Sequence, residues 1–224
     1  LNDSIINDGT INVAAGNSVV STRGSLLNSG DFNFNGDSLI VDEDVQNSGT
    51  LALGANSDLE VGGSWNNFGT FTAGAGSNVT FVAPSGTQTI TGGGSAFCGL
   101  TINSASPSSA TFETGSAIDI NCDITITNGA LDVVSAAHTI NLAGNFNNNA
   151  GASGFDAGTS TLIFDGTSNQ SITHPSNFYN VTIANSTGAE VSPVAANDLN
   201  IDGDFVINAN GILNTNNKDF NLAG

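Results

Sequence analysis

The chain has 224 residues, with 20 Asp and Glu against 2 Lys and Arg, and a formal net charge of −18 at pH 7. Such a charge repels phosphate backbones and anionic headgroups, so we expect no nucleic acid and no anionic membrane as partner. No apolar run approaches the roughly 18 residues of a membrane helix, and the first residues, LNDSIINDG, lack signal-peptide features, so we expect no membrane insertion either.

A short phrase returns along the first third of the chain. It reads NDGTINV at Asn7, NSGDFNF at Asn28, NSGTLAL at Asn47 and NFGTFTA at Asn67, with looser copies further on. The glycines of these phrases, Gly9, Gly30, Gly49 and Gly69, are 21, 19 and 20 residues apart. A fixed period of about 20 residues is typical of a stacked repeat architecture.

Within each period the apolar residues alternate as they do in β-strands. One pair lies two and four residues after the glycine, as at Phe32 and Phe34, and a second pair follows about ten residues after it, as at Leu59 and Val61. A 20-residue unit cannot bury its own apolar face and must stack on its neighbours. The sequence therefore predicts an all-β fold, a right-handed parallel β-solenoid (β-helix) of about eleven rungs of ~20 residues with uncapped ends, roughly 50 Å long.

A longer repeat overlies the short one. FCGLTIN at Phe97 matches FYNVTIA at Phe178, an offset of 81, and INLAG at Ile140 matches FNLAG at Phe220, an offset of 80. We expect one solenoid domain over residues 1–224, with a partial copy of the larger repeat at 39–58 and full copies at 59–139 and 140–224.

The run from 62 to 106, GGSWNNFGTFTAGAGSNVTF and onward, is echoed by residues 143 to 186. These runs resemble modules of large bacterial secreted and cell-surface proteins, in the style of filamentous-haemagglutinin-type adhesins. The resemblance implies an extracellular, fibrous protein of the bacterial cell surface with a role in adhesion. It implies no particular ligand.

The asparagines before the repeat glycines have a structural and a functional interpretation. Asn tolerates left-handed backbone and, repeated at one position of a solenoid, can stack into a ladder of side-chain amides. We expect Asn7, Asn28, Asn47 and Asn67 to form such a turn ladder, with ligand contact as the alternative.

Acidic clusters are the candidates for a metal site. They are Asp42, Glu43 and Asp44; Asn121 and Asp123; and Asp202 and Asp204. Calcium takes six to eight oxygen ligands at one point, whereas these clusters lie four rungs apart. We therefore expect no metal and no cofactor, and a solvated acidic edge that discourages lateral aggregation; calcium at Asp42 and Asp44 or at Asp202 and Asp204 is the alternative.

An enzyme acting on polysaccharide is the less favoured interpretation. A cleft with paired carboxylates needs unequal loops, and a lyase of acidic sugars needs cations, of which the chain has only Arg23 and Lys218. His138 and His174 have no nucleophile nearby in sequence. We predict that the protein is not an enzyme.

The two cysteines carry the sharpest local prediction. Cys98 and Cys122 each stand two and four positions before inward apolar residues, so we expect both to point inward. Their separation is one rung with a longer corner. Neighbouring rungs lie about 4.8 Å apart, within the Cα separation of a disulfide. We expect a Cys98–Cys122 bridge, with two free thiols as the alternative, and Tyr179 with Gly203 filling the same space in the next repeat.

These features favour a structural function: a stiff rod or fibre segment of an extracellular adhesin or of a head-to-tail filament. Its partners would be copies of itself or flanking rungs of a longer chain. The alternative is a glycan- or calcium-binding adhesive module, for which the sequence offers Trp65 and Tyr179 only as isolated aromatic residues.

Overall fold

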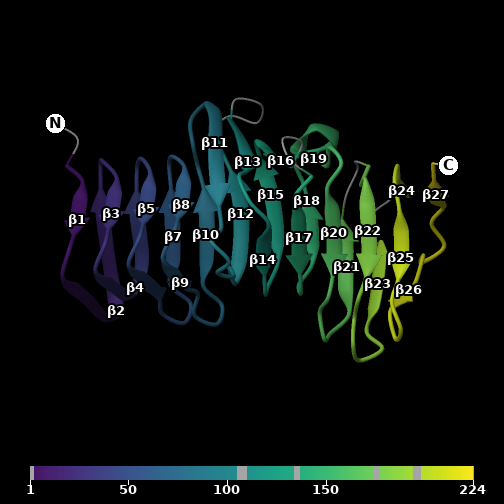
Figure 1. Cartoon of the computed structure of the whole chain (residues 1–224), viewed down its shortest axis with the longest axis horizontal. Helices are drawn as coiled ribbons and strands as arrows, with labels where there is room; N and C mark the ends of the chain where they lie inside the picture. The colour runs from purple at the N-terminus through teal and green to yellow at the C-terminus, as the bar shows by residue number, and fades with distance from the viewer. Residues whose placement is uncertain (1–2, 105–109, 134–136, 174–176, 194–197, 224) are drawn as a thin grey trace.

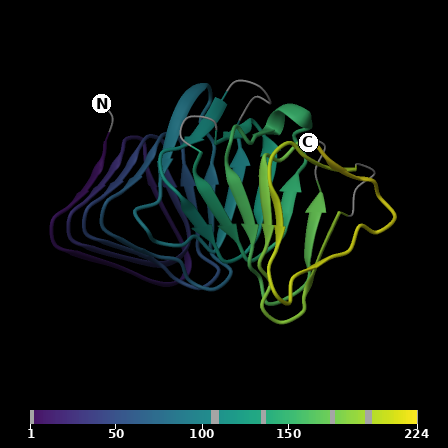
Figure 2. The same ribbon diagram turned by 45° about the vertical axis from the view of Figure 1, so that its right-hand side comes forward.

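The computed structural model describes residues 3–104, 110–133, 137–173, 177–193 and 198–223. This part of the chain forms an all-β parallel solenoid of about nine turns of about 21 residues. Successive turns lie side by side along the long axis, with the two termini at opposite ends of the stack (Figure 1). Figure 2 shows the turns stacked one behind another.

Four parallel sheets form the walls of the solenoid. In the eight-stranded sheet the order is β1 (Ile5–Asn7), β3 (Leu26–Asn28), β5 (Val45–Asn47), β8 (Trp65–Asn67), β11 (Gly86–Thr91), β13 (Ala110–Thr114), β16 (Ala130–Asp132) and β19 (Phe155–Asp156). In the twelve-stranded sheet the order is β26 (Ile212–Leu213), β23 (Glu190–Pro193), β21 (Gln170–Thr173), β18 (Phe146–Asn148), β15 (Ile124–Asn128), β12 (Gly99–Asn103), β10 (Asn78–Phe81), β7 (Asp58–Val61), β4 (Asp31–Val41), β6 (Thr50–Leu53) and β9 (Thr70–Thr72), and β2 (Thr10–Thr22) pairs with β4.

The remaining two sheets belong to the second half of the chain. One contains β14 (Ile118–Ile120), β17 (Thr139–Leu142), β20 (Thr161–Phe164), β22 (Asn180–Ile183) and β25 (Phe205–Ile207), and the other contains β24 (Leu199–Ile201) and β27 (Phe220–Leu222). One 3-10 turn, η1 (Ala152–Gly154), precedes β19. No helix in the described ranges has the length and apolar character needed to cross a membrane.

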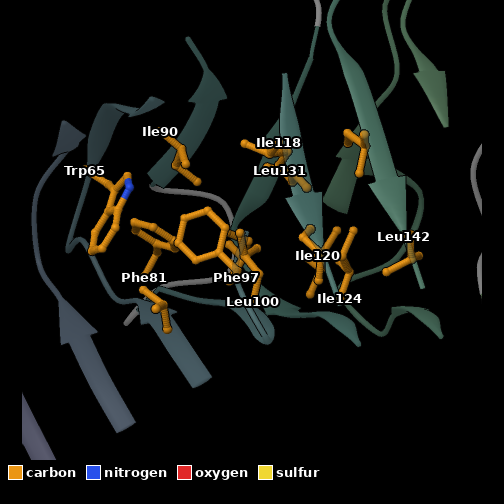
Figure 3. Packing of buried hydrophobic residues seen from close by; sticks show 14 of the residues in the cluster. Trp65, Phe81, Ile90, Phe97, Leu100, Ile118, Ile120, Ile124, Leu131 and Leu142 are labelled. Carbon is orange, nitrogen blue, oxygen red and sulfur yellow. The ribbon is translucent and has the colours of Figure 1, made fainter. Parts of the chain in front are cut away.

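The predicted strand alternation places the core. Leu39 pairs with Leu59, and Leu59 with Val79, so like residues stack above one another with every turn. These inward side chains are fully buried and form one continuous hydrophobic cluster from the first half to the second. Figure 3 shows Trp65, Phe81 and Phe97 within it.

The structure confirms the parallel β-solenoid but not the predicted rung count. Leu39, Leu59 and Val79 follow one another at the predicted period, whereas the step from Phe146 to its register partner Ile172 is longer. Turns of the second half thus vary in length, since Leu162 pairs with Val181 across a shorter step. About nine turns at about 4.8 Å give a rod of about 43 Å, while the hand of the coil stays a prediction.

The terminal turns of the described chain differ from the rest in burial. Inward residues of the first turns, such as Ile11 and Val13, and of the last turns, such as Leu213 and Phe220, are only partly buried. Strands β2, β26 and β27 each pair with a single neighbouring strand. Apolar surface is therefore present at both ends of this segment.

Candidate functional site

The four repeated asparagines form a buried column beside the core. The Nδ2 of Asn7 donates to Oδ1 of Asn28, Asn28 donates to Asn47, and Asn47 donates to Asn67, each at 2.7 Å. The four side chains are at most 4 % exposed. This burial leaves their amides to bond with the neighbouring turns.

Each ladder amide also bonds the backbone of the next turn. Nδ2 of Asn28 donates to the Thr50 carbonyl at 2.8 Å, and Nδ2 of Asn47 donates to the Thr70 carbonyl at 3.0 Å. None of the four lies among the described residues with positive φ; the left-handed asparagines are found at other turns, as at Asn56 and Asn210. The ladder positions therefore need Asn for its amide, not for left-handed backbone.

A second buried amide pair was not predicted. Nδ2 of Asn185 donates to Oε1 of Gln170 at 2.8 Å, and Nε2 of Gln170 donates to the Leu142 carbonyl at 2.8 Å. Both side chains are buried. Neither residue stands in the Asn–x–Gly phrase, so the repeat pattern carried no signal for them.

The predicted disulfide is confirmed. Cys98 and Cys122 are bonded, with their Cα atoms 4.8 Å apart. The bond lies at a corner of two stacked turns, where Phe97 pairs with Ile120 and the Cys122 amide donates to the Cys98 carbonyl at 2.7 Å. Cys98 is buried, but Cys122 is only half-buried because this corner faces the outside of the solenoid.

The same corner recurs in the next copy of the longer repeat without cysteines. Phe178 pairs with Ile201, and the Gly203 amide donates to the Tyr179 carbonyl at 2.8 Å. A Cβ added to Gly203 would lie 3.0 Å from two atoms of the Tyr179 ring, so the ring occupies the space above the glycine. A large and a small side chain thus replace the disulfide at this position.

Carboxylates of the acidic clusters accept hydrogen bonds at the corners of the turns. Oδ1 of Asp44 accepts the Ser64 amide at 2.7 Å, and Oδ1 of Asp123 accepts the Asn145 amide at 2.7 Å. Glu43 accepts the Ser25 hydroxyl at 3.3 Å. These carboxylates cap the backbone of a neighbouring turn.

The other calcium candidates are also spread over separate contacts. Asp42, Asp202 and Asp204 are exposed, and Asp202 accepts the Asn177 amide at 3.1 Å. Among the described residues no three His, Cys, Asp or Glu side chains are placed to hold a metal ion. Calcium at these positions therefore has no ligand cluster to support it.

The groups considered for catalysis do not converge. Arg23 lies exposed before β3, Lys218 lies before β27 at the other end of the stack, and His138 is partly buried before β17, while His174 lies outside the described residues. A hollow of about 550 Å³ does hold Asp156, Asp202 and Tyr179. Its carboxylates are engaged locally, since Oδ1 of Asp156 accepts the Gly158 amide at 3.2 Å and Asp202 bonds Asn177.

The surface that best fits a binding function is a groove of about 360 Å³ outside the eight-stranded sheet. Its floor is made by Ile6, Leu27 and Gln46, which are register partners on β1, β3 and β5. Its wall is the column of turn residues Asp8, Ser29, Ser48 and Phe68. The groove therefore crosses four turns along the rod axis.

Backbone hydrogen bonds fix the wall. The amides of Ser29, Ser48 and Phe68 donate to the carbonyls of Asn7, Asn28 and Asn47, at 2.9, 2.8 and 2.8 Å. The wall thus stands directly on the asparagine ladder. Phe68 is 77 % exposed and Ile6 67 % exposed, the two largest exposures among the large apolar side chains described.

Sequence reasoning considered Trp65 and Tyr179 and missed Phe68. Trp65 belongs to the core with 0 % exposure, and its ring packs against Phe71 and Phe97 at 4.8 and 5.4 Å between centroids. The signal for Phe68 lies in the repeat itself. The residue between the Asn and the Gly of the repeated phrase is polar in the preceding copies, at Asp8, Ser29 and Ser48, and is aromatic only at Phe68.

Comparison with protein-family models, with curated proteins and with solved structures finds no match for this chain.

Proposed function

We propose that this chain is a structural element of an extracellular protein of the bacterial cell surface, a stiff rod or fibre segment of an adhesin or of a head-to-tail filament. The observation that carries the proposal is the unbroken parallel pairing of turn upon turn over one hydrophobic core. Each turn contacts only its neighbours, so the stack extends in one direction and forms an elongated rod.

Three further features support this role. The Cys98–Cys122 disulfide fits an oxidising compartment. The net charge of −18 opposes lateral association of rods. The two Lys and Arg residues leave trypsin two sites in the whole chain.

The partners we propose are further turns of the same kind, from flanking repeats or from another copy. The partly buried residues of the terminal turns, such as Val13 and Leu213, would gain cover from a stacked turn. A contact that joins one end to the other end of the next copy does not close and makes filaments.

Electron microscopy and light scattering over a range of protein concentrations test this role. We expect end-to-end chains of constant width that lengthen as concentration rises. A strictly monomeric particle at all concentrations would defeat the stacking proposal.

A second candidate function is an adhesive binding module. The exposed Phe68 beside a groove favours it, because a large exposed ring in the middle of a repeat stack contributes nothing to burial. Nothing in the acidic clusters of the described ranges favours the calcium-binding form of this function. A glycan array tests the carbohydrate-binding form.

A further inference from the structure

We propose that the groove between Ile6 and Phe68 binds an extended, positively charged segment of a partner protein, with an apolar side chain seated against Phe68 and a lysine or arginine paired with Asp8. This inference gives the binding-module function its ligand class and does not depend on end-to-end stacking.

Phe68 differs in its place from the other exposed apolar side chains. The other large apolar side chains that are exposed in the described chain belong to its first or last turns: Ile6, Val19, Val206, Ile207, Ile212 and Leu222. Phe68 instead lies in the turn between β8 and β9, where β8 pairs with β5 and β11 and β9 pairs with β6. Its ring faces solvent at the last corner of the asparagine ladder, away from both ends of the stack.

The charge around the groove selects a cationic partner. Residues 3–72 contain nine Asp and Glu and only one cationic residue, Arg23. Asp8 stands in the wall itself and is exposed. A field of one sign attracts a partner of the opposite sign and repels an anionic ligand or the acidic side of a neighbouring rod.

The polar groups of the groove argue against a sugar as the ligand. The hydroxyl of Ser29 donates to Oδ1 of Asp8 at 2.6 Å, and that of Ser48 points to the Asn28 carbonyl at 3.4 Å. The floor residues Ile6 and Leu27 are apolar. The amides of Asn28 and Asn47, which also line the groove, are bonded within the ladder, so Gln46 is left as the polar group of the floor. A hydroxyl-rich ligand needs several dedicated partners, whereas an apolar side chain needs none.

The dimensions fit a short extended peptide. Four turns are separated by three spacings of about 4.8 Å, so the groove runs about 14 Å along the rod. An extended chain advances about 3.4 Å per residue, which places about four residues in the groove. The carboxylate of Asp8 and the ring of Phe68 lie at opposite ends of this length.

The test is a titration of the protein with four defined probes, followed by NMR shifts of backbone amides. The probes are an alternating lysine–leucine tetrapeptide, its glutamate–leucine and lysine–serine counterparts, and the neutral tetrasaccharide maltotetraose. We expect only the lysine–leucine peptide to shift the amides of Ile6, Gln46 and Phe68, with an affinity that falls as salt is added.

Variants separate specific binding from general attraction to an acidic protein. Phe68→Ser, which installs the residue type of Ser48, should weaken the lysine–leucine peptide at least tenfold and leave the salt dependence unchanged. Asp8→Asn should weaken it less and flatten the salt dependence. Val206→Ser removes a distant exposed apolar side chain and should change nothing.

Equal affinity for wild type and Phe68→Ser would overturn the proposal, as would preferential binding of the tetrasaccharide or self-association that Phe68→Ser abolishes. An unchanged denaturation midpoint of Phe68→Ser shows that the variant is folded. The light-scattering test of end-to-end stacking is read separately, so failure of either proposal leaves the other intact.

Discussion

The two halves of the solenoid use different means to hold their turns together. In the first half the turns repeat every 19 to 21 residues, and one column of buried amides, Asn7 to Asn67, joins four turns. Beyond this column the turns vary in length, since Leu162 pairs with Val181 but Phe146 pairs with Ile172. Aromatic clusters and the Cys98–Cys122 bond lie between these turns.

The difference shows what a constant period allows. A side chain can bond its own copy in the next turn when the two copies stay in register, as on β1, β3, β5 and β8. At Asn67 the column ends on the carbonyl of Gly92, because the following turn carries a longer corner. Beyond this point packed rings, such as Phe146 and Phe178, also contact one another across turns of unequal length.

Two aromatic clusters provide such contacts. We expect substitutions in them to lower the free energy of unfolding more than the other changes predicted below. Phe178 packs against Phe146 and Phe155 at 5.3 and 5.8 Å, and Phe97 packs against Trp65 and Phe71 at 5.4 and 5.5 Å. Phe178→Ala should cost about 4 kcal/mol in the free energy of unfolding. Chemical denaturation measures this, and Phe97→Ala should match it within about 1 kcal/mol; a near-neutral result at either site would show that the clusters are not equivalent.

Removal of the disulfide should give the second largest loss in the free energy of unfolding. The bond closes a loop with a sequence separation of 24, so Cys98→Ser with Cys122→Ser should cost about 3 kcal/mol. The double variant Cys98→Tyr with Cys122→Gly installs the pair found at Tyr179 and Gly203 and should recover part of that loss. A Tyr–Gly variant less stable than the serine variant would contradict the equivalence of the two corners.

The ladder itself is tested at its centre. Asn47→Ala removes the donor to Asn67 and leaves buried polar atoms of Asn67 and of the Thr70 carbonyl without this partner, at a cost of about 2 kcal/mol. The control is Asn33→Ala, since Asn33 donates to Asn12 between the same kind of turns but in an exposed position. We expect the control to change the free energy of unfolding by less than about 0.5 kcal/mol, and equal losses would refute a special role of burial.

The smallest effect concerns pH. Desolvation and the nearby charge of Asp119 raise the pKa of Asp165 above its ordinary value of 3.8. Its ionised form is thus disfavoured in the folded protein, a penalty that is complete above the raised pKa, shrinks as pH falls through it and is absent below 3.8. Asp165→Asn should therefore stabilise the protein slightly at pH 7 and not at pH 3, as read from denaturation midpoints; a gain that persists at pH 3 would contradict this cause.

The sequence predicted the fold because its signals were local and repeated. The Asn–x–Gly phrase placed the turns, and the alternation around Leu59 and Val61 placed the core. The Cys98–Cys122 bond was predictable because the solenoid spacing fixes which residues stack. The rung count was overestimated, since the longer corners after Phe81 break the short period from which it was counted.

The groove was less predictable for a physical reason. The groove is formed by outward residues that become neighbours only when the turns stack, as Ile6 and Leu27 do. It also depends on the exposure of Phe68. Alternation marks inward residues through their apolar character, but an outward residue is constrained by solvent alone. The buried pair Gln170 and Asn185 was missed for a related reason, because it lies where the period has already changed.

The measurement that tests the central claim most directly is native-state hydrogen exchange on Asn47→Ala and on the reduced wild-type protein. If each half is held by its own contacts, Asn47→Ala raises the exchange of amides around β3, β5 and β8, and reduction raises it around β12 and β15. The opposite half should keep its protection in each case. If either change raised the exchange of all described strands together, the two halves would be one cooperative unit and the account would be wrong.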